Sequence, residues 1–103
     1  MLYTVKIRKE ALADIQEIVA WYEVQKLGLG GDFKIIVTKR IDLLETFPHT
    51  YCIRYDKIRC IPLEKFPYMV HYTIDEEKSK VEVLAVISTH RSPEIWRIKT
   101  RKK

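Results

Sequence analysis

The chain has 103 residues, 47% hydrophobic and 32% charged, a composition that indicates one globular domain over residues 1–103 and excludes a disordered chain. The first ten residues lack the apolar stretch of a signal peptide, and no apolar run reaches the roughly 20 residues that span a bilayer, so we expect a cytoplasmic protein with no membrane partner. The net charge of +5 comes from residues 88–103, which hold six bases against one acid, whereas residues 1–87 hold 13 of each. A basic end attracts a polyanion or an acidic protein, although many such ends are only solvated.

The first half of the chain predicts a strand followed by two helices. Residues 2–8 alternate between apolar and polar, which indicates a short strand with Tyr3, Val5 and Ile7 on one face. Residues 10–26 change to helical spacing and carry an apolar stripe of Leu12, Ile15, Val19 and Tyr22, with Ala11 and Ile18 beside it. The three glycines then predict a tight helical hairpin. A second helix is expected from about Asp32 to Phe47, with an apolar stripe that includes Phe47, and Pro48 ends it.

The second half of the chain has the period of two that strands require. Residues 58–64 predict a strand with Pro62 at an edge or bulge, and Phe66-Pro67 predicts a corner. Residues 68–74 predict a strand with Tyr68, Val70, Tyr72 and Ile74 on one face. After a polar loop, residues 81–87 predict a central strand, because they are apolar on both faces. Ser92-Pro93 predicts the start of a short helix.

Together these elements predict an α+β fold. The N-terminal strand precedes an antiparallel helical hairpin, which packs on one face of a small, mostly antiparallel sheet, and a short C-terminal helix follows. We expect the other face to be partly open and within reach of the basic tail. His71 alternates away from Tyr72 and is expected on that open face, while His49 in the loop is expected to face solvent.

The two cysteines, Cys52 and Cys60, have neither CxxC nor metal-ligand spacing. We expect them to be unbridged thiols in or near the core, because disulfides are rare in the cytosol. The sequence predicts neither a metal site nor a cofactor.

The stretch from Ile58 to Trp96 resembles the RelE/ParE toxin superfamily. The resemblance rests on Arg59 in a strand, Phe66-Pro67-Tyr68, Tyr72, the strand VEVLAV, and His90 followed by Arg91, Pro93 and Trp96. The first half agrees, since ALADIQEIVAWYE and GLGGDF fit the helix and turn of that pattern, so the resemblance covers nearly the whole chain. The ending H-R-x-P-x-x-W is more similar to the ParE branch and its plasmid-stabilisation relatives than to the RelE branch.

The resemblance implies the toxin of a bacterial type II toxin–antitoxin system, which inhibits growth and is neutralised by a cognate antitoxin protein. The ParE branch implies a toxin directed at DNA gyrase, and the RelE branch implies a ribosome-dependent endoribonuclease that cleaves messenger RNA. Operator DNA is expected to be bound only through the antitoxin complex. Three hypotheses follow: a ParE-like toxin, a RelE-like ribonuclease, and a non-toxic relative that only binds an antitoxin.

The ribonuclease hypothesis has candidate residues for metal-free cleavage. His90 is the type of side chain that most often serves as general acid or base, and Arg59 and Arg91 are suited to hold a phosphate. Arg59 has an alternative role as the structural partner of an acid such as Glu64 or Glu82. The branch typically ends in an aromatic hydroxyl or a His–Tyr pair, but here Trp96 holds that place, and an indole is neither acid nor base.

The ParE-like hypothesis needs a surface for the target instead of a catalytic centre. The candidate target-binding residues are four cations and an aromatic residue from the second half of the chain: Lys57, Lys65, Arg91, Trp96 and Arg97. Trp96 has an alternative role as a packing residue under the sheet.

Overall fold

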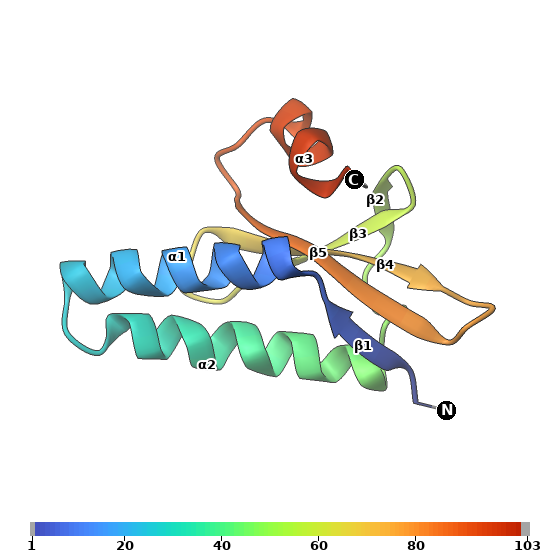
Figure 1. Cartoon of the computed structure of the whole chain (residues 1–103), viewed down its shortest axis with the longest axis horizontal. Helices are drawn as coiled ribbons and strands as arrows, with labels where there is room; N and C mark the ends of the chain where they lie inside the picture. The colour runs from blue at the N-terminus through green and yellow to red at the C-terminus, as the bar shows by residue number, and fades with distance from the viewer. Residues whose placement is uncertain (1, 102–103) are drawn as a thin grey trace.

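Residues 2–101, the part of the chain that the computed structural model describes, form one sheet with two helices against one face and a third against the other (Figure 1). In chain order the elements are β1 (Thr4–Ile7), α1 (Lys9–Gln25), α2 (Leu29–Asp42), the 3₁₀ turn η1 (Leu43–Glu45), β2 (Ile53–Tyr55), β3 (Ile58–Pro62), β4 (Tyr68–Asp75), β5 (Lys80–Ser88) and α3 (Pro93–Thr100). In these residues no helix is long and apolar enough to cross a membrane.

The sheet has the strand order β1-β5-β4-β3-β2. β1 runs parallel to β5, and all the other neighbours are antiparallel, which confirms the predicted α+β fold. The short strand β2 was not predicted. It pairs with β3 through a two-residue turn in which Asp56 and Lys57 both have positive φ, the geometry of a type I′ hairpin. The usual Asn-Gly or Asp-Gly signal of such a turn is missing from the sequence.

β5 contains a β-bulge, and it is apolar on both faces because helices cover both of them. His71 of β4 lies opposite Ala85 and Tyr72 lies opposite Val83, so Leu84 is the extra residue. Side chains before and after the bulge therefore change face. Three valines of β5, Val81, Val83 and Val86, face α1 and α2, whereas Leu84, Ala85 and Ile87 face α3.

The main core lies between the sheet and the helical hairpin. Its centre is an aromatic group in which Phe33 of α2 is fully buried and packs against Tyr22, Phe66 and Tyr68. The face of β4 that carries Tyr68, Val70, Tyr72 and Ile74 contacts this core, as predicted.

Two residues predicted on the apolar stripes are exposed instead: Leu12 by 44% and Phe47 by 60%. The buried line of α1 is centred on Ala11 and Ile18, which turns Leu12 towards solvent. α2 ends at Asp42, and the turn η1 changes the helical phase before Phe47.

The hairpin closes tightly at Gly30, and this predicts the effect of a substitution there. A Cβ at Gly30 would lie 2.4 Å from the backbone oxygen of Val19, and Glu23 accepts hydrogen bonds from the Gly28 and Gly30 amides at 2.8 and 3.0 Å. Gly30→Ala should force α1 and α2 apart and lower the free energy of unfolding by about 1–3 kcal/mol in urea titrations.

Gly31 is the matched control for this experiment. No atom lies within 4 Å of a Cβ at Gly31, so Gly31→Ala should be neutral or stabilise α2 by up to about 1 kcal/mol. Equal effects of the two substitutions would contradict the close approach of the helices at Gly30.

Candidate functional site

The second face of the sheet is covered by α3 over its centre. Trp96 is only 7% exposed and packs into a group that we call the α3 cluster, which consists of Tyr55, Ile58, Cys60, Met69, Leu84, Ala85, Ile87 and Trp96. The expectation of a partly open face is therefore wrong at this position, because α3 turns its indole inwards and its charges outwards. Of the two cysteines, both unbridged, Cys60 lies in this cluster, whereas Cys52 is exposed and not in or near the core.

His71 lies on this face as predicted, but it is fully buried in the interface between the sheet and α3. Its Nδ1 is 2.9 Å from the Tyr55 hydroxyl, which donates to Thr100 Oγ1 at 3.3 Å. The Thr100 hydroxyl in turn donates to the Trp96 carbonyl at 2.8 Å. A chain of polar contacts thus connects β4 and β2 with the last turn of α3.

The chemistry of this interface is that of a packed core. Burial lowers the pKa of His71 to about 4, and the nearby Arg54 charge acts in the same direction. Burial also raises the pKa of Cys60 to about 11, so the thiol stays protonated at neutral pH. Neither group is suited to proton transfer near pH 7.

Polar contacts around its rim hold α3 in place. Arg8 donates to the carbonyls of Thr100 and Arg101 at 3.2 and 3.4 Å and so satisfies the C-terminal end of the helix. Two ion pairs add to this: Lys99 with Asp14 at 2.9 Å, and Arg97 with Asp56 at 3.1 Å. The basic end of the chain is therefore held against the second face up to Arg101, while residues 102–103 lie outside the described residues.

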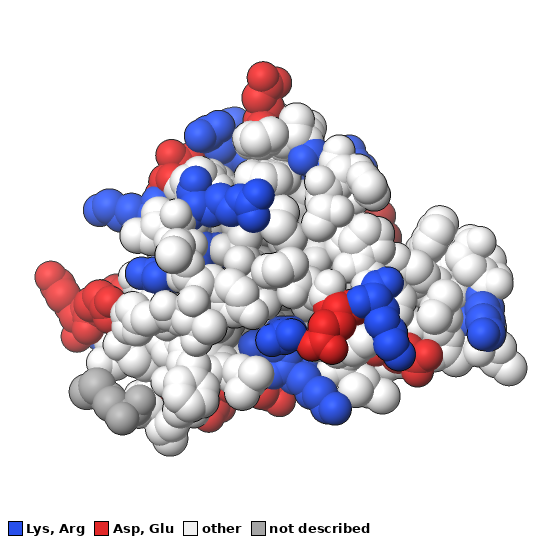
Figure 2. All heavy atoms as spheres, turned by 180° about the vertical axis from the view of Figure 1, so that it is seen from behind, with Lys and Arg blue, Asp and Glu red and all other residues white. Residues whose placement is uncertain are grey.

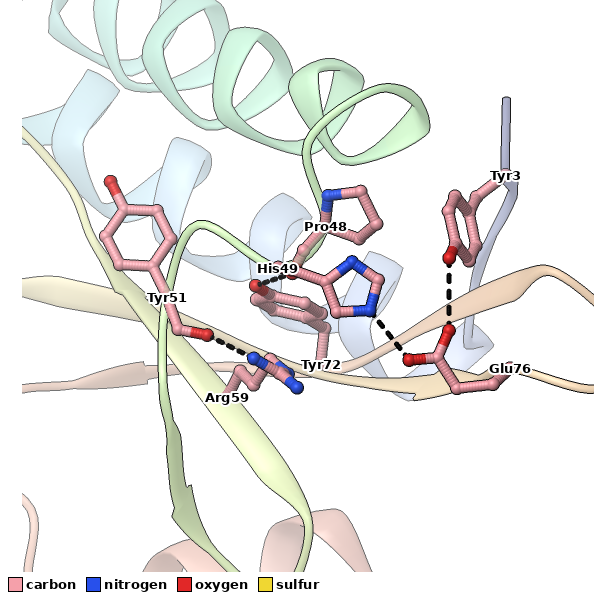
Figure 3. A network of polar contacts seen from close by, with 7 residues as sticks. All are labelled: Tyr3, Pro48, His49, Tyr51, Arg59, Tyr72 and Glu76. Atoms are coloured by element: carbon pink, nitrogen blue, oxygen red, sulfur yellow. Dashed lines mark hydrogen bonds and ion pairs between the residues drawn. The ribbon is translucent and has the colours of Figure 1, made fainter. Parts of the chain in front are cut away.

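Arg59 belongs to a network on the helical side of the sheet (Figure 3). Its Nη1 donates to the Tyr51 carbonyl at 2.6 Å, and the Tyr72 hydroxyl, whose pKa is raised to about 12 by burial, donates to the Pro48 carbonyl at 2.6 Å. The structural partner of Arg59 is thus a backbone carbonyl and not the acid that the alternative role required. The predicted partners Glu64 and Glu82 pair with Arg40 and Arg8 instead.

The same network holds His49, which is exposed as expected. Its Nε2 is 2.7 Å from a Glu76 oxygen, and the other Glu76 oxygen accepts a hydrogen bond from Tyr3 at 3.0 Å. The two hydrogen bonds, that from His49 first, lower the pKa of Glu76. These contacts attach the segment before β2 to both β1 and β4.

The three candidate catalytic residues are not brought together. Arg59 is paired with Tyr72, whereas Ser88, which precedes His90 and Arg91, is paired with Tyr68. Four residues of strand separate these positions, about 13 Å at 3.3 Å per residue. His90 and Arg91 are both exposed beyond the end of β5. A general base, by contrast, lies about 3 Å from the atom that gives up the proton, or reaches it through one water.

The candidate target-binding residues are divided between two ends of the molecule. Lys57 of the β2–β3 turn and Arg97 of α3 lie at one end and line a groove with Arg8, Asp56, Ile58, Thr73, Leu84, Thr100 and Arg101. Lys65 lies beyond the opposite end of β3, near the turn that leads to Arg91. Trp96 is buried and serves as the anchor of α3. Seen from behind, the surface likewise carries its Lys and Arg side chains in separate groups with acids among them, around an uncharged centre (Figure 2).

Residues that the sequence did not single out also belong to these surfaces. Asp14 bonds both Lys99 and the backbone amide of Val86, and Arg8 connects β1 with the end of α3. In the sequence, the only indication of a role for Asp14 is its position next to the apolar line of α1, four residues before Ile18. Among residues 2–101, His, Cys, Asp and Glu side chains form no group of three or more that could hold a metal ion.

Comparison of the chain with known protein families finds a match over most of its length. The model described as ParE toxin of type II toxin–antitoxin system, parDE, matches residues 5–93. No curated protein matches the chain.

Three solved structures share the fold at low sequence identity. The chromosomal ParDE toxin–antitoxin system from P. aeruginosa has a TM-score of 0.74 at 15% identity, over 84% of this chain and 96% of that one. A RelE toxin mutant from E. coli in the free state has a TM-score of 0.66 at 18% identity, over 93% and 92%. The RelBE2 toxin–antitoxin complex from Mycobacterium tuberculosis has a TM-score of 0.60 at 18% identity, over 85% and 99%. At these identities the likeness shows the fold alone.

Proposed function

The chain belongs to the ParE toxin family of type II toxin–antitoxin systems, and from this we propose that it inhibits growth by acting on DNA gyrase, without bond-breaking chemistry of its own. A cognate antitoxin neutralises it, and operator DNA is bound only by the complex of the two proteins. The match over residues 5–93 supports the ParE assignment, and complexes with antitoxins among the structures of similar fold are consistent with the partner.

The observation that carries this proposal is the separation of the candidate catalytic groups. Arg59 is engaged with the Tyr51 carbonyl, about 13 Å of strand from the end of β5. The buried histidine, His71, has a pKa of about 4, and Trp96 holds the place where a terminal hydroxyl is expected. A metal-free ribonuclease needs a base, an acid and a fixed cation around one phosphate, and within residues 2–101 the three candidates Arg59, His90 and Arg91 do not meet in this way.

The surface that we propose for the target is the groove beside α3. Lys57 and Arg97 line it together with Arg8 and Arg101, and Asp56 is the one acid among its lining residues. Trp96 acts indirectly, because it holds α3 and therefore Arg97 in position. Lys65 and Arg91 lie beyond the other ends of β3 and β5 and do not line this groove.

The RelE-like alternative keeps one observation in its favour. His90 and Arg91 are adjacent and exposed at the end of β5, where a bound RNA would meet both a titratable group and a cation. In that case both would be catalytic together with Arg59, after a rearrangement that frees Arg59. A non-toxic relative that only binds an antitoxin is the remaining alternative.

Induction of the toxin alone in growing cells separates these hypotheses. We expect growth to stop and DNA-damage signalling to rise within minutes while translated messenger RNA stays intact. His90→Ala and Arg59→Ala should leave the damage signal in place wherever the variant remains folded. Rapid fragmentation of messenger RNA that either substitution abolishes would establish the RelE-like alternative, and normal growth would establish the non-toxic one.

A further inference from the structure

β5 has an unpaired edge along its second half. β1 pairs only with residues 80–83 of β5 and ends at Ile7, whereas β5 continues to Ser88. From Leu84 onwards, no strand within residues 2–101 lies on that side of β5. An unpaired strand edge is a template for another chain.

The backbone groups that remain free at this edge determine the direction of a strand that can pair with it. The Val86 amide donates to Asp14 Oδ2 at 3.1 Å, and the Ser88 carbonyl accepts from the Arg91 amide at 3.1 Å. The alternation of a strand turns the Val86 carbonyl and the Ser88 amide towards the same edge. In a parallel pair, one residue of the added strand donates to the Val86 carbonyl and accepts from the Ser88 amide. In an antiparallel pair, one residue of the added strand would instead bond both the amide and the carbonyl of the same β5 residue. The free pair therefore favours a parallel strand.

The edge opens into a cleft of about 350 Å³ between α1 and α3, which lie on opposite faces of the sheet (Figure 1). Ile18, Ile87 and Ile95 supply apolar lining. Glu17 on α1 and Arg91 before α3 also line the cleft, and neither forms an ion pair with a residue in the range 2–101. One wall thus offers an unpaired carboxylate and the other an unpaired guanidinium.

We propose that this cleft binds a short extended segment of the antitoxin as a parallel strand against Val86–Ser88. The inference rests on the proposed function, because the antitoxin is the partner assumed there. The residue that bonds Val86 and Ser88 lies opposite Ile87, whose side chain faces α3, so its own side chain faces α3 and Arg91. Its neighbours face α1 and Glu17. The segment therefore carries an acidic residue next to a basic one, with an aliphatic residue for the apolar lining.

The test uses the full-length toxin and the antitoxin encoded beside it, with affinity measured by calorimetry. Arg91→Glu and Glu17→Lys should each weaken binding at least tenfold. The matched controls Lys39→Glu and Glu77→Lys, which reverse exposed charges away from the cleft, should leave affinity within about twofold. Hydrogen exchange of the Ser88 amide should slow at least tenfold in the wild-type complex, a change that a purely electrostatic effect of the substitutions does not produce.

The outcomes separate the inference from the proposed function. The strand site is wrong if the wild-type toxin binds the antitoxin tightly, neither cleft substitution weakens binding, and hydrogen exchange of the Ser88 amide is unchanged in the complex. The toxin–antitoxin assignment stands in that case. Slower exchange at Val5 or Arg54 in place of Ser88 assigns the antitoxin to an outer edge strand and likewise overturns the strand site. No binding of the antitoxin by the wild-type toxin overturns both.

Discussion

Trp96→Ala is expected to lower the free energy of unfolding by about 3–5 kcal/mol, the range for removing a buried Trp or Phe side chain. The centroid of the indole lies 5.6 Å from that of the Tyr55 ring and 5.3 Å from that of the His71 ring. The indole is the only aromatic side chain that α3 contributes to the α3 cluster. A domain of this size is stabilised by only about 5–15 kcal/mol. Urea titration followed by far-ultraviolet circular dichroism measures the loss.

Trp96→Phe is the matched variant, because the indole N–H is buried without a hydrogen-bond partner among the described residues. An unsatisfied buried donor costs about 1–3 kcal/mol, and phenylalanine removes it while it keeps an aromatic ring. We expect Trp96→Phe to lose less than half as much stability as Trp96→Ala. Equal losses, or an alanine variant as stable as the wild type, would contradict the docked position of α3.

His71 is expected to make the protein less stable in mild acid. Because its pKa in the folded state is about 4, below the ordinary 6.5, folding favours the neutral ring. Its contribution is complete above about pH 6.5 and is lost as the pH falls from 6.5 to 4. At about 1.4 kcal/mol per pKa unit, protonation costs about 3 kcal/mol. The ring is surrounded by Tyr55, Cys60, the Trp96 indole and the Arg54 charge, none of which carries the negative charge that would compensate an imidazolium.

Urea titrations at several pH values between 7 and 4 measure this effect. Carboxylates that form ion pairs also lose their contribution in this range, so the informative quantity is the difference between variants. His71→Gln should have a flatter profile than the wild type, whereas the exposed His90→Gln should follow the wild-type profile. Parallel profiles for His71→Gln and the wild type would show that His71 is not buried as a neutral ring.

The sequence was sufficient for most of the fold, because local periodicity determines most of its elements. The alternation of Tyr68, Val70, Tyr72 and Ile74 identified the face of β4 that meets the helices. Strand β2 escaped prediction, since three residues are too few for a periodic pattern and its turn has no glycine. The bulge at Leu84 is equally invisible, because it depends on the register with another strand.

The site was less predictable, because its contacts join residues far apart in the chain. Trp96 and His71 meet only when α3 folds back over the sheet, and no local pattern reports that. The structural alternative for Arg59 was an ion pair with an acid, but its partner is a backbone carbonyl, a group that every residue carries. The unpaired edge of β5 arises from the different lengths of β1 and β5, which only the paired strands show.

The action on gyrase is tested most directly with purified components. The toxin is incubated with gyrase, ATP and supercoiled plasmid, and cleaved DNA is trapped with detergent and protease. We expect linear plasmid to accumulate, the antitoxin to prevent it, and Lys57→Glu to reduce it at least tenfold. Intact plasmid at every toxin concentration, together with cleavage of messenger RNA on translating ribosomes by the same preparation, would contradict the proposal.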